Sequence, residues 1–355
     1  MINVAALISG VNVPSARFRM RQHFASLHAN GINANELLSG IEKYTPVPRY
    51  LKNFFFGNNE LSFNAFHIIR KLQKRKLVDE ANKSDIVWLE RCLIEGKITH
   101  ELKIKKPMVL DLDDAIWLGE AKGFADVLVR QAQVVVAGNT YVADWCRQYN
   151  NCVNIIPTAV NTSVFKPISK IKQHKIFNIG WIGTSSNFKF LKTIVPAISI
   201  LLKEYSNVHF SICSNRDPKF FDLNYAFVQW NQDNEVDFIN SIDIGLMPLW
   251  DDEWSRGKCS FKMLQYLSCE VPAVVSPVGM NKQVADEWGY NFSPETNDEW
   301  VEIMRNLIKD EQLRKESGER GRRLIEQKYS TSVISSQLTS VFKELYQSCE
   351  IGRAH

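Results

Sequence analysis

One continuous stretch, residues 256–279 with the sequence RGKCSFKMLQYLSCEVPAVVSPVG, constrains the fold of this chain most strongly. It combines, in order, the patterns of a loop, a helix, a tight turn, a buried strand and a glycine turn. The run Ala273, Val274 and Val275 is wholly apolar, which is typical of a parallel strand covered on both faces. The stretch therefore predicts an α/β domain with a ligand at the ends of this strand.

Two lysines flank the start of the predicted helix. Lys258 and Lys262 lie where unpaired backbone N–H groups and the helix dipole already favour an anion. The local chemistry therefore suits a phosphate group.

The whole run also resembles a known segment. Its helix with a polar inner side chain, small residue, proline, apolar strand and Ser-Pro-Val-Gly turn resembles the donor site of retaining family-4 glycosyltransferases of GT-B fold. That family usually has two glutamates here, eight residues apart, one for the transferred sugar and one for the donor ribose. This chain departs from the pattern, with Gly257 at the first position and Gln265 at the second. Gln265 can still bond a ribose diol, and Asp252 or Lys258 is a candidate for the first role.

Length and composition agree with two domains in a reducing compartment. A chain of 355 residues with 45% hydrophobic content can bury two cores. Seven cysteines, without C-x-x-C or metal-ligand spacing, favour free thiols. The start MINVAALISG lacks the basic segment of a signal peptide, and we find no apolar run long enough to span a bilayer. We therefore expect a cytoplasmic protein.

The first strand and the loop after it form a candidate acceptor region. Residues 4–8 predict a buried strand, and Gly10 predicts a turn before a helix. Because G-x-G-x-x-G is absent, an ordinary strand-to-helix turn is one interpretation. The family resemblance implies the other, in which this loop faces the cleft between domains with Ser15, Arg17 and Arg19 near the acceptor.

Residues 43–76 interrupt the alternation of strands and helices with a basic and aromatic segment. It holds eight basic residues, one acidic residue and seven aromatic residues. Its helical part places apolar residues on one face and basic residues on the others: Phe63, Phe66, Ile69 and Leu72, against Arg70, Lys71, Lys74 and Arg75. One interpretation is a helix that docks on an anionic membrane, and another is a core-packed helix with a solvated basic side. Nucleic acid is a third, but no binding motif accompanies the segment.

The segment KPMVLDLDDAIW predicts a strand that ends in three aspartates. Asp111 and Asp113 could be the nucleophile and acid/base of a haloacid-dehalogenase phosphatase, or a metal-binding D-x-D of the other glycosyltransferase fold. Both fit poorly, because Ala115 replaces the usual Thr or Val and no later acidic motif completes a metal site. The family resemblance implies instead that Asp113 lies beneath the donor sugar. Asp114 could equally cap the following helix.

The second domain is expected to follow a polar linker at residues 166–175. FNIGWIGTSSNFKFL then predicts a strand and a small-residue turn before a helix, a geometry that can donate backbone N–H groups to a diphosphate. Lys189 follows in the helix, and Trp230 lies in a later loop where the family's nucleobase rests. A core position for Trp230 is the alternative. Residues 297–326 and 331–347 predict two further helical stretches.

By resemblance we expect an α/β protein of GT-B fold, with two Rossmann-like domains facing a cleft. The domains would comprise residues 1–165 and 176–329, and residues 330–355 would form a C-terminal helix that returns to the first domain. The implied activity is transfer of a hexosyl-type sugar, with retention, from a nucleotide-diphosphate donor to a glycan or lipid-linked acceptor in polysaccharide or glycoconjugate biosynthesis. Lysines, hydroxyls and helix N-termini would neutralise the diphosphate, so we expect no metal and no cofactor. The competing interpretation is a GT-B protein without catalysis that serves as a binding or scaffolding partner.

The resemblance implies three groups of site residues. They are the catalytic Asp113 and Lys262; the donor-binding Gly183, Thr184, Ser185, Lys189, Trp230, Lys258, Gln265 and Gly279; and the acceptor-side Gly10, Ser15, Arg17 and Arg19. The free thiols lead us to expect a cytoplasmic enzyme, and the membrane interpretation of the basic segment would place it at the inner face of the membrane.

Overall fold

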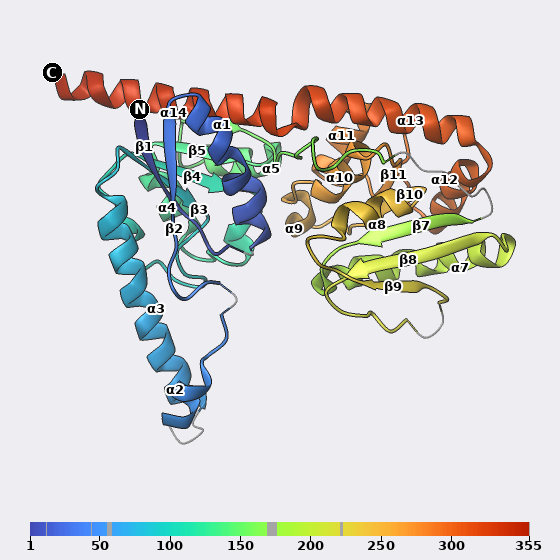
Figure 1. The fold of residues 1–355 in the computed structure, drawn as a ribbon, viewed down its shortest axis with the longest axis horizontal. Coiled ribbons are helices and arrows are strands. Elements are labelled where there is room, and N and C mark those ends of the chain that lie inside the picture. The colour runs from blue at the N-terminus through green and yellow to red at the C-terminus, as the bar shows by residue number, and fades with distance from the viewer. Residues whose placement is uncertain (12, 44, 55–58, 169–175, 221–222, 355) are drawn as a thin grey trace. The chain divides into compact units, whose positions relative to one another are not determined.

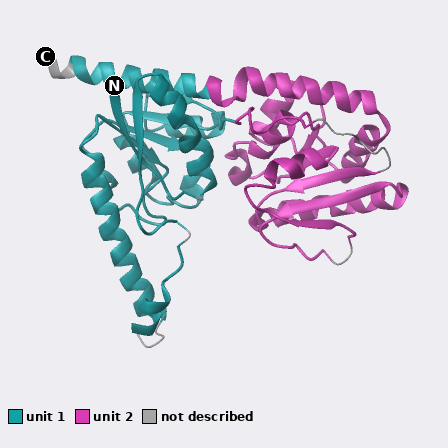
Figure 2. Cartoon of the chain, viewed as in Figure 1, with its two compact units in different colours: residues 1–159, 334–355 teal, residues 160–333 magenta. Residues whose placement is uncertain are grey.

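The computed structural model describes the whole chain except residues 12, 44, 55–58, 169–175, 221–222 and 355. The chain divides into two compact units (Figure 2). Unit 1 comprises Met1–Ala159 and Ile334–His355, and unit 2 comprises Val160–Val333. The linker predicted at residues 166–175 lies after the start of unit 2, and most of it falls outside the described residues.

Unit 1 is built on a six-stranded sheet in which all neighbouring strands are parallel. The strands follow one another across the sheet as β2 (Ile32–Leu37), β1 (Ile2–Leu7), β3 (Ile86–Glu90), β4 (Met108–Leu112), β5 (Val134–Ala137) and β6 (Val153–Ile155). Every residue of β3, β4 and β5 is buried. This is the burial that a parallel sheet covered on both faces requires.

Helices cover both faces of this sheet, and alternate strand residues enter two cores. Val87 and Leu89 belong to one core, and Ile86 and Trp88 belong to the other. The helical elements before the C-terminal one are η1 (Ala16–Met20), η2 (Arg21–His23), α1 (Phe24–Ala29), α2 (Arg49–Phe54), α3 (Asn59–Ala81), η3 (Glu101–Lys103), η4 (Ile116–Leu118), α4 (Ala125–Gln131) and α5 (Thr140–Arg147).

The last helix, α14 (Thr331–Ala354), completes the second of these cores from Ile334 onward. The ring of Phe342 lies 5.1 Å from that of Trp88, and His23 Nδ1 lies 2.7 Å from the hydroxyl of Ser335. Burial lowers the pKa of His23 to about 3, and the nearby Arg19 acts in the same direction. The prediction that the C-terminal helix returns to the first domain is confirmed.

Unit 2 is built on a five-stranded parallel sheet. Its strands run in the order β11 (Ala273–Val275), β10 (Ile244–Met247), β7 (Phe177–Ile182), β8 (Val208–Ser214) and β9 (Ala226–Gln229). The helical elements are η5 (Ser185–Asn187), α6 (Phe188–Leu191), η6 (Lys192–Ile194), α7 (Val195–Glu204), α8 (Glu235–Ser241), α9 (Glu253–Arg256), α10 (Phe261–Ser268), α11 (Met280–Trp288), α12 (Asn297–Lys309), α13 (Glu311–Leu324) and η7 (Ile325–Tyr329). Asp310 caps α13 by accepting from Leu313 N at 2.8 Å, so the helical stretch predicted at residues 297–326 is divided.

In unit 1, α2 and α3 form an arm that extends away from the sheet (Figure 1). The predicted apolar face of α3 is only partly correct. Phe66 is buried, but Phe63 and Leu72 are 52% and 55% exposed. Lys74, predicted on a solvent-facing side, is 2% exposed. Since Ser62, Phe66, Lys74 and Val78 are buried while apolar residues also lie on the opposite side, composition alone could not orient this helix.

Two other features of the sequence analysis concern this region and the membrane. Tyr44, Phe55 and Phe56 of the aromatic segment lie outside the described residues. Among the helices that the structure describes, none combines the length and apolarity needed to cross a membrane.

Candidate functional site

The glycine turn after β11 fixes the loop that leads into α10. Gly279 has a φ of 54°, and a Cβ at this position would lie 2.7 Å from the carbonyl oxygen of Arg256. Glycine alone tolerates both the left-handed conformation and this close approach. Ser260, also left-handed with a φ of 50°, donates its hydroxyl to Asn281 Oδ1 at 2.7 Å. The loop before α10 is therefore held from both ends.

The helix α10 brings two predicted residues together with one that the sequence analysis missed. Lys262 Nζ donates to Gln265 Oε1 at 2.8 Å and to Glu235 Oε1 at 3.1 Å. Gln265 Nε2 donates to the same Glu235 oxygen at 3.1 Å. Gln265 and Glu235 are 0% and 1% exposed, whereas the Lys262 side chain is 26% exposed. Lys262 is thus the member of this cluster that reaches solvent, and the amide predicted to bond a ribose is buried.

Two more predicted lysines lie against one aromatic ring. Lys189 Nζ is 4.8 Å from the ring centre of Phe190, and Lys258 Nζ is 6.0 Å from it. Lys189 also lies 5.0 Å from the ring of Trp250, and Lys258 lies 5.5 Å from that of Trp254. Contacts between cations and aromatic faces hold such ammonium groups in place while leaving them able to meet an anion. Lys189 and Lys258 therefore converge at the same end of unit 2.

The turn after β7 differs from its prediction. A Cβ at Gly183 would lie 2.6 Å from the indole of Trp181, which explains the glycine. Thr184 Oγ1 lies 2.8 Å from a neighbouring serine hydroxyl, and Ser185 N donates to Asn215 Oδ1 at 2.7 Å. The helical segments that follow contain three and four residues, so their dipoles are small. The N–H group of Ser185 that was expected to meet a diphosphate is therefore bonded within unit 2.

Two further positions can now be placed in unit 2. Trp230 follows β9, is half-buried, and donates its backbone N–H to Ser214 O at 2.9 Å. It thus lies at the end of a strand rather than in the core. Asp252, a candidate for the role of the family's first glutamate, caps α9 by accepting from Ser255 N at 2.7 Å. One carboxylate oxygen of Asp252 is therefore used within unit 2.

In unit 1, the acidic residues after β4 share one arginine. Arg91 donates from Nε to Asp113 at 2.6 Å, from Nη2 to Asp114 at 2.6 Å and from Nη1 to Glu120 at 2.7 Å. Although burial acts to raise it, the pKa of Asp113 lies below its ordinary value because of Arg91. Asp113 is therefore an ionised carboxylate in a fixed position. Asp114 binds Arg91 and does not cap the following helical turn, whose N-cap position is Ala115.

The structure corrects the prediction for Arg19. This residue is 3% exposed and donates to Asp111 Oδ1 and to the carbonyl oxygen of Ile156, each at 2.8 Å. Asp111 is 1% exposed and also accepts from Trp88 Nε1 at 3.3 Å. Arg19 therefore neutralises a buried aspartate instead of facing an acceptor, and Asp111 is not available as a phosphatase nucleophile. Within the described ranges, no three His, Cys, Asp or Glu side chains are grouped so that they could hold a metal ion.

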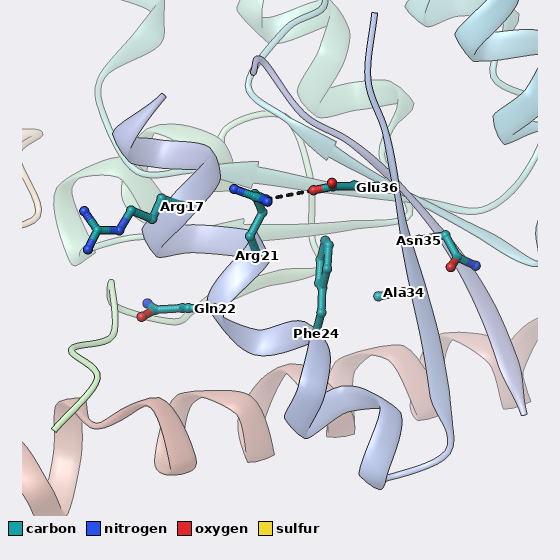
Figure 3. A pocket seen from close by; sticks show the side chains of 7 residues that line it. All are labelled: Arg17, Arg21, Gln22, Phe24, Ala34, Asn35 and Glu36. Atoms are coloured by element: carbon teal, nitrogen blue, oxygen red, sulfur yellow. Dashed lines mark hydrogen bonds and ion pairs between the residues drawn. The ribbon is translucent and has the colours of Figure 1, made fainter. Parts of the chain in front are cut away.

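The remaining acceptor-side residues are also partly structural. Ser15 is 8% exposed and hydrogen-bonds Glu90, and a Cβ at Gly10 would lie 2.5 Å from a carboxylate oxygen of Glu42. Arg17, in contrast, lines an open pocket of about 530 Å³ in unit 1 (Figure 3). The pocket is lined by Arg17, Arg21, Gln22, Phe24, Ala34, Asn35 and Glu36. An ion pair of 2.8 Å between Arg21 and Glu36 crosses it from the helical side to the edge strand β2 (Figure 3).

Comparisons with known proteins give a family match for part of the chain. Residues 175–310 match the family described as Glycosyl transferases group 1. The capsular polysaccharide biosynthesis glycosyltransferase CapM of Staphylococcus aureus is 22% identical over 195 residues, which are 50% of this chain and 50% of that protein. The chain thus spans about half the length of this curated relative.

Solved structures cover nearly the whole chain at low identity. Sucrose-phosphate synthase from Thermosynechococcus elongatus has a TM-score of 0.70 at 12% identity, covering 98% of this chain and 100% of that one. HepE of Anabaena, in complex with UDP-glucose, has a TM-score of 0.68 at 13% identity and covers 97% of this chain and 100% of that one. The chain therefore has the GT-B fold, and its residues 175–310 carry the match to glycosyl transferases group 1.

Proposed function

We propose that this chain is a glycosyltransferase that moves a sugar, with retention, from a nucleotide-diphosphate donor to a glycan or lipid-linked acceptor in polysaccharide or glycoconjugate biosynthesis. The observation that carries the proposal is the set of lysines Lys189, Lys258 and Lys262 in unit 2, within the segment matched by the family. All three follow the carboxyl ends of the neighbouring strands β7 and β10, where cations can neutralise a diphosphate. The UDP-glucose complex of HepE makes UDP-sugars the first donors to test.

The proposed chemistry assigns separate roles to the two units. When the bond between sugar and diphosphate breaks, negative charge grows on the leaving diphosphate, and Lys262 with Lys258 would stabilise it. Asp113, an ionised carboxylate fixed by Arg91, would act on the positive charge that develops on the transferred sugar. Because the lysines already supply positive charge, the proposal includes no metal.

Donor binding is tested by thermal unfolding with a panel that contains UDP-glucose, UDP, GDP and ADP. A ligand at 100 times its Kd should add about 2.7 kcal/mol to the free energy of unfolding. The anomeric proton in the NMR spectrum of the product then distinguishes retention from inversion. If none of these nucleotides stabilises the protein, the proposal is contradicted. Binding without turnover would instead favour the catalytically inactive alternative, which none of the comparisons supports.

The role of Asp113 is tested by Asp113→Asn, which keeps the size of the side chain. We expect turnover to fall more than tenfold while the affinity for UDP is nearly unchanged, because the carboxylate acts on the developing charge and not on the nucleoside. Thermal unfolding of the variant controls for lost stability. Normal turnover would remove Asp113 from the mechanism, and activity that a chelator abolishes and Mg²⁺ restores would contradict the metal-free part.

The proposal extends to the surface on which a lipid-linked acceptor would be presented. Six large apolar residues at least 50% exposed lie on the arm: Tyr50, Phe54, Leu61, Phe63, Ile68 and Leu72. Five basic residues of the same arm are exposed: Arg49, Lys52, Lys71, Arg75 and Lys76. Basic side chains near an anionic membrane contribute about 1 kcal/mol each, and exposed apolar side chains can insert at its interface. This docking would make the protein a peripheral one at the cytoplasmic face.

Liposome co-sedimentation tests the arm. Changing Lys71, Arg75 and Lys76 to Gln should weaken binding to anionic vesicles, and added salt should weaken binding of the unchanged protein. The matched control changes Lys103, Lys105 and Lys122, exposed lysines elsewhere in unit 1, to Gln. Equal sedimentation of the two variants, or binding indifferent to lipid charge, would leave the arm without a membrane role.

A further inference from the structure

Glu235 is a buried carboxylate beside the donor-side lysine, and neither its position in the sequence nor the comparisons give it a role. It is the first residue of α8, is 1% exposed, and accepts hydrogen bonds from Lys262 and Gln265, each at 3.1 Å. We propose that Glu235 supplies the carboxylate that this chain lacks at position 265, and that it orients Lys262 toward the donor diphosphate. This inference rests on the proposed function.

The burial of Glu235 needs an explanation. An acidic residue in the first turn of a helix is stabilised by the helix dipole, but it can have this benefit while solvated. Removing a carboxylate from water costs several kcal/mol, and a single cation does not always repay that cost. Buried ion pairs are therefore weak evidence for stability, and a pair next to a candidate ligand site favours a role in fixing geometry.

The hydrogen bonds define what Glu235 can do to its neighbours. An ammonium group has three donors, and two of those of Lys262 point at the oxygens of Glu235 and Gln265. The third can meet a ligand, because the Lys262 side chain is 26% exposed. Gln265 uses its amide nitrogen on Glu235 and its amide oxygen on Lys262. Gln265 therefore links the two charges through its hydrogen bonds.

The charges also lie near the carboxyl end of β8. Cys213 belongs to that strand and is buried. Burial raises the pKa of its thiol to about 11, with the ammonium of Lys262 lowering the pKa and the carboxylate of Glu235 raising it. Both charges are therefore close to a strand end, the part of an open α/β sheet where ligands bind. A glutamate at position 265 would also place a carboxylate beside Lys262, because residues three positions apart lie on the same face of a helix.

Simple electrostatics and the proposed role of Glu235 predict opposite changes in the affinity for UDP. Glu235→Gln removes a negative charge near the bound phosphates, so attraction alone predicts tighter binding of UDP. Loss of orientation of Lys262 predicts the opposite, because a misdirected ammonium no longer donates a charge-assisted hydrogen bond. We expect UDP to bind about tenfold more weakly to Glu235→Gln, while uridine, which has no phosphate, binds as before.

The matched variant is the exchange Glu235→Gln with Gln265→Glu, which moves the carboxylate to the other side of Lys262. We expect this double variant to recover UDP affinity to within about threefold of the unchanged protein. The Kd for UDP is measured by titration calorimetry and that for uridine by NMR competition, and thermal unfolding reports on folding. If Glu235→Gln proves unstable, the double variant alone still tests the role of Glu235. Its UDP affinity should be near normal, because it keeps one carboxylate beside Lys262.

The binding measurements distinguish a failure of the role of Glu235 from a failure of the proposed function. An unchanged protein that binds no UDP would contradict the proposed function itself. Normal or tighter UDP binding by Glu235→Gln, an equal loss for UDP and uridine, or a folded double variant that fails to recover would overturn the role of Glu235 and leave the proposed function standing.

Discussion

The two parallel sheets of this chain end in opposite electrostatic environments. After the strands of unit 1, Arg91 and Lys43 bind the carboxylates of Asp113, Asp114, Glu120 and Glu95 at 2.6 to 2.8 Å. In unit 2, Lys189 and Lys258 lie against the ring of Phe190, and Lys262 binds the carboxylate of Glu235. These four acids of unit 1 are thus all bound by cations of the same unit, whereas Lys189 and Lys258 of unit 2 lie against aromatic rings.

The difference indicates that the charges of unit 1 mainly hold the fold together. Arg91 is 8% exposed and has a φ of 55°, a strained conformation for a residue with a side chain. Its three carboxylate partners come from the segment after β4, so the ion pairs fix that segment on β3. Lys189 and Lys258 of unit 2 instead lie on aromatic rings, which carry no net charge, and Lys262 pairs with Glu235.

The largest effect that the comparison predicts is the loss of Arg91. Arg91→Met would leave Asp113, Asp114 and Glu120 without their common cation, and we expect the free energy of unfolding to fall by about 3 to 5 kcal/mol. Urea unfolding measures it. Arg305→Met in unit 2 is the control, because its pair with Glu204 is solvated and should matter little. Similar losses for the two variants would contradict a structural role specific to unit 1.

Lys262→Ala should have the next largest effect, on binding instead of stability. Loss of one charge-assisted hydrogen bond to a phosphate costs about 1.5 to 3 kcal/mol, which corresponds to roughly 10- to 150-fold weaker UDP binding. Titration calorimetry measures the change. Lys282→Ala removes an exposed lysine of the same unit that pairs with Asp286, and should bind UDP normally. If Lys262→Ala bound UDP as tightly as the unchanged protein, the lysine would not serve an anionic ligand, and the contrast between the two units would fail.

The buried imidazole of unit 1 predicts a dependence of stability on pH. Because the pKa of His23 falls from 6.5 in the unfolded chain to about 3 in the fold, the unfolded state binds more protons between these values. His23 thus adds stability that is complete above pH 6.5 and is lost as the pH falls toward 3. When the pH falls from 7 to 5, the free energy of unfolding should therefore decrease in both proteins. The decrease should be about 1 to 2 kcal/mol smaller for His23→Gln than for the unchanged protein. Parallel curves for the two proteins would show that His23 does not titrate on unfolding.

The smallest predicted effect concerns Lys74, a cation that unit 1 buries in the arm. Burial lowers the pKa of Lys74 to about 8, and Arg70 adds to this, so its charged form is disfavoured in the fold. Stability should therefore rise with pH between about 8 and 10.5, where the unfolded chain still binds the proton. Lys74→Met should stabilise the protein by about 1 kcal/mol at pH 7, and less at pH 10. A destabilised variant at pH 7 would mean that nearby carboxylates need this lysine.

The features that the sequence predicted correctly are those encoded within a few residues. The apolar run of β11, the helix before it and the glycine at position 279 follow from local spacing and from sterics. The GT-B prediction came from the resemblance of residues 256–279 to a known family, and the solved structures confirm the fold. Periodicity failed for α3, where apolar side chains lie on both sides and local spacing cannot decide which side packs.

The sequence analysis missed ion pairs between residues that are far apart in the chain. Glu235 lies 27 residues before Lys262, and Arg19 lies 92 residues before Asp111. Charged residues are usually exposed, so a sequence interpretation leaves Arg19 and Lys74 on the surface. Which of many acids finds a given base depends on tertiary packing, and neither composition nor spacing contains that information.

The return of α14 has a consequence for the order in which the chain folds during synthesis. Residues 334–355 supply one wall of a unit 1 core, with Phe342 against Trp88, yet they follow all of unit 2 in the chain. Unit 2 is one continuous segment and can fold once residue 333 has left the ribosome, whereas unit 1 must wait with an apolar sheet face open to water. The half of the molecule that is translated first is therefore completed last, and ribosome stalling before Ile334 would release a species prone to aggregation.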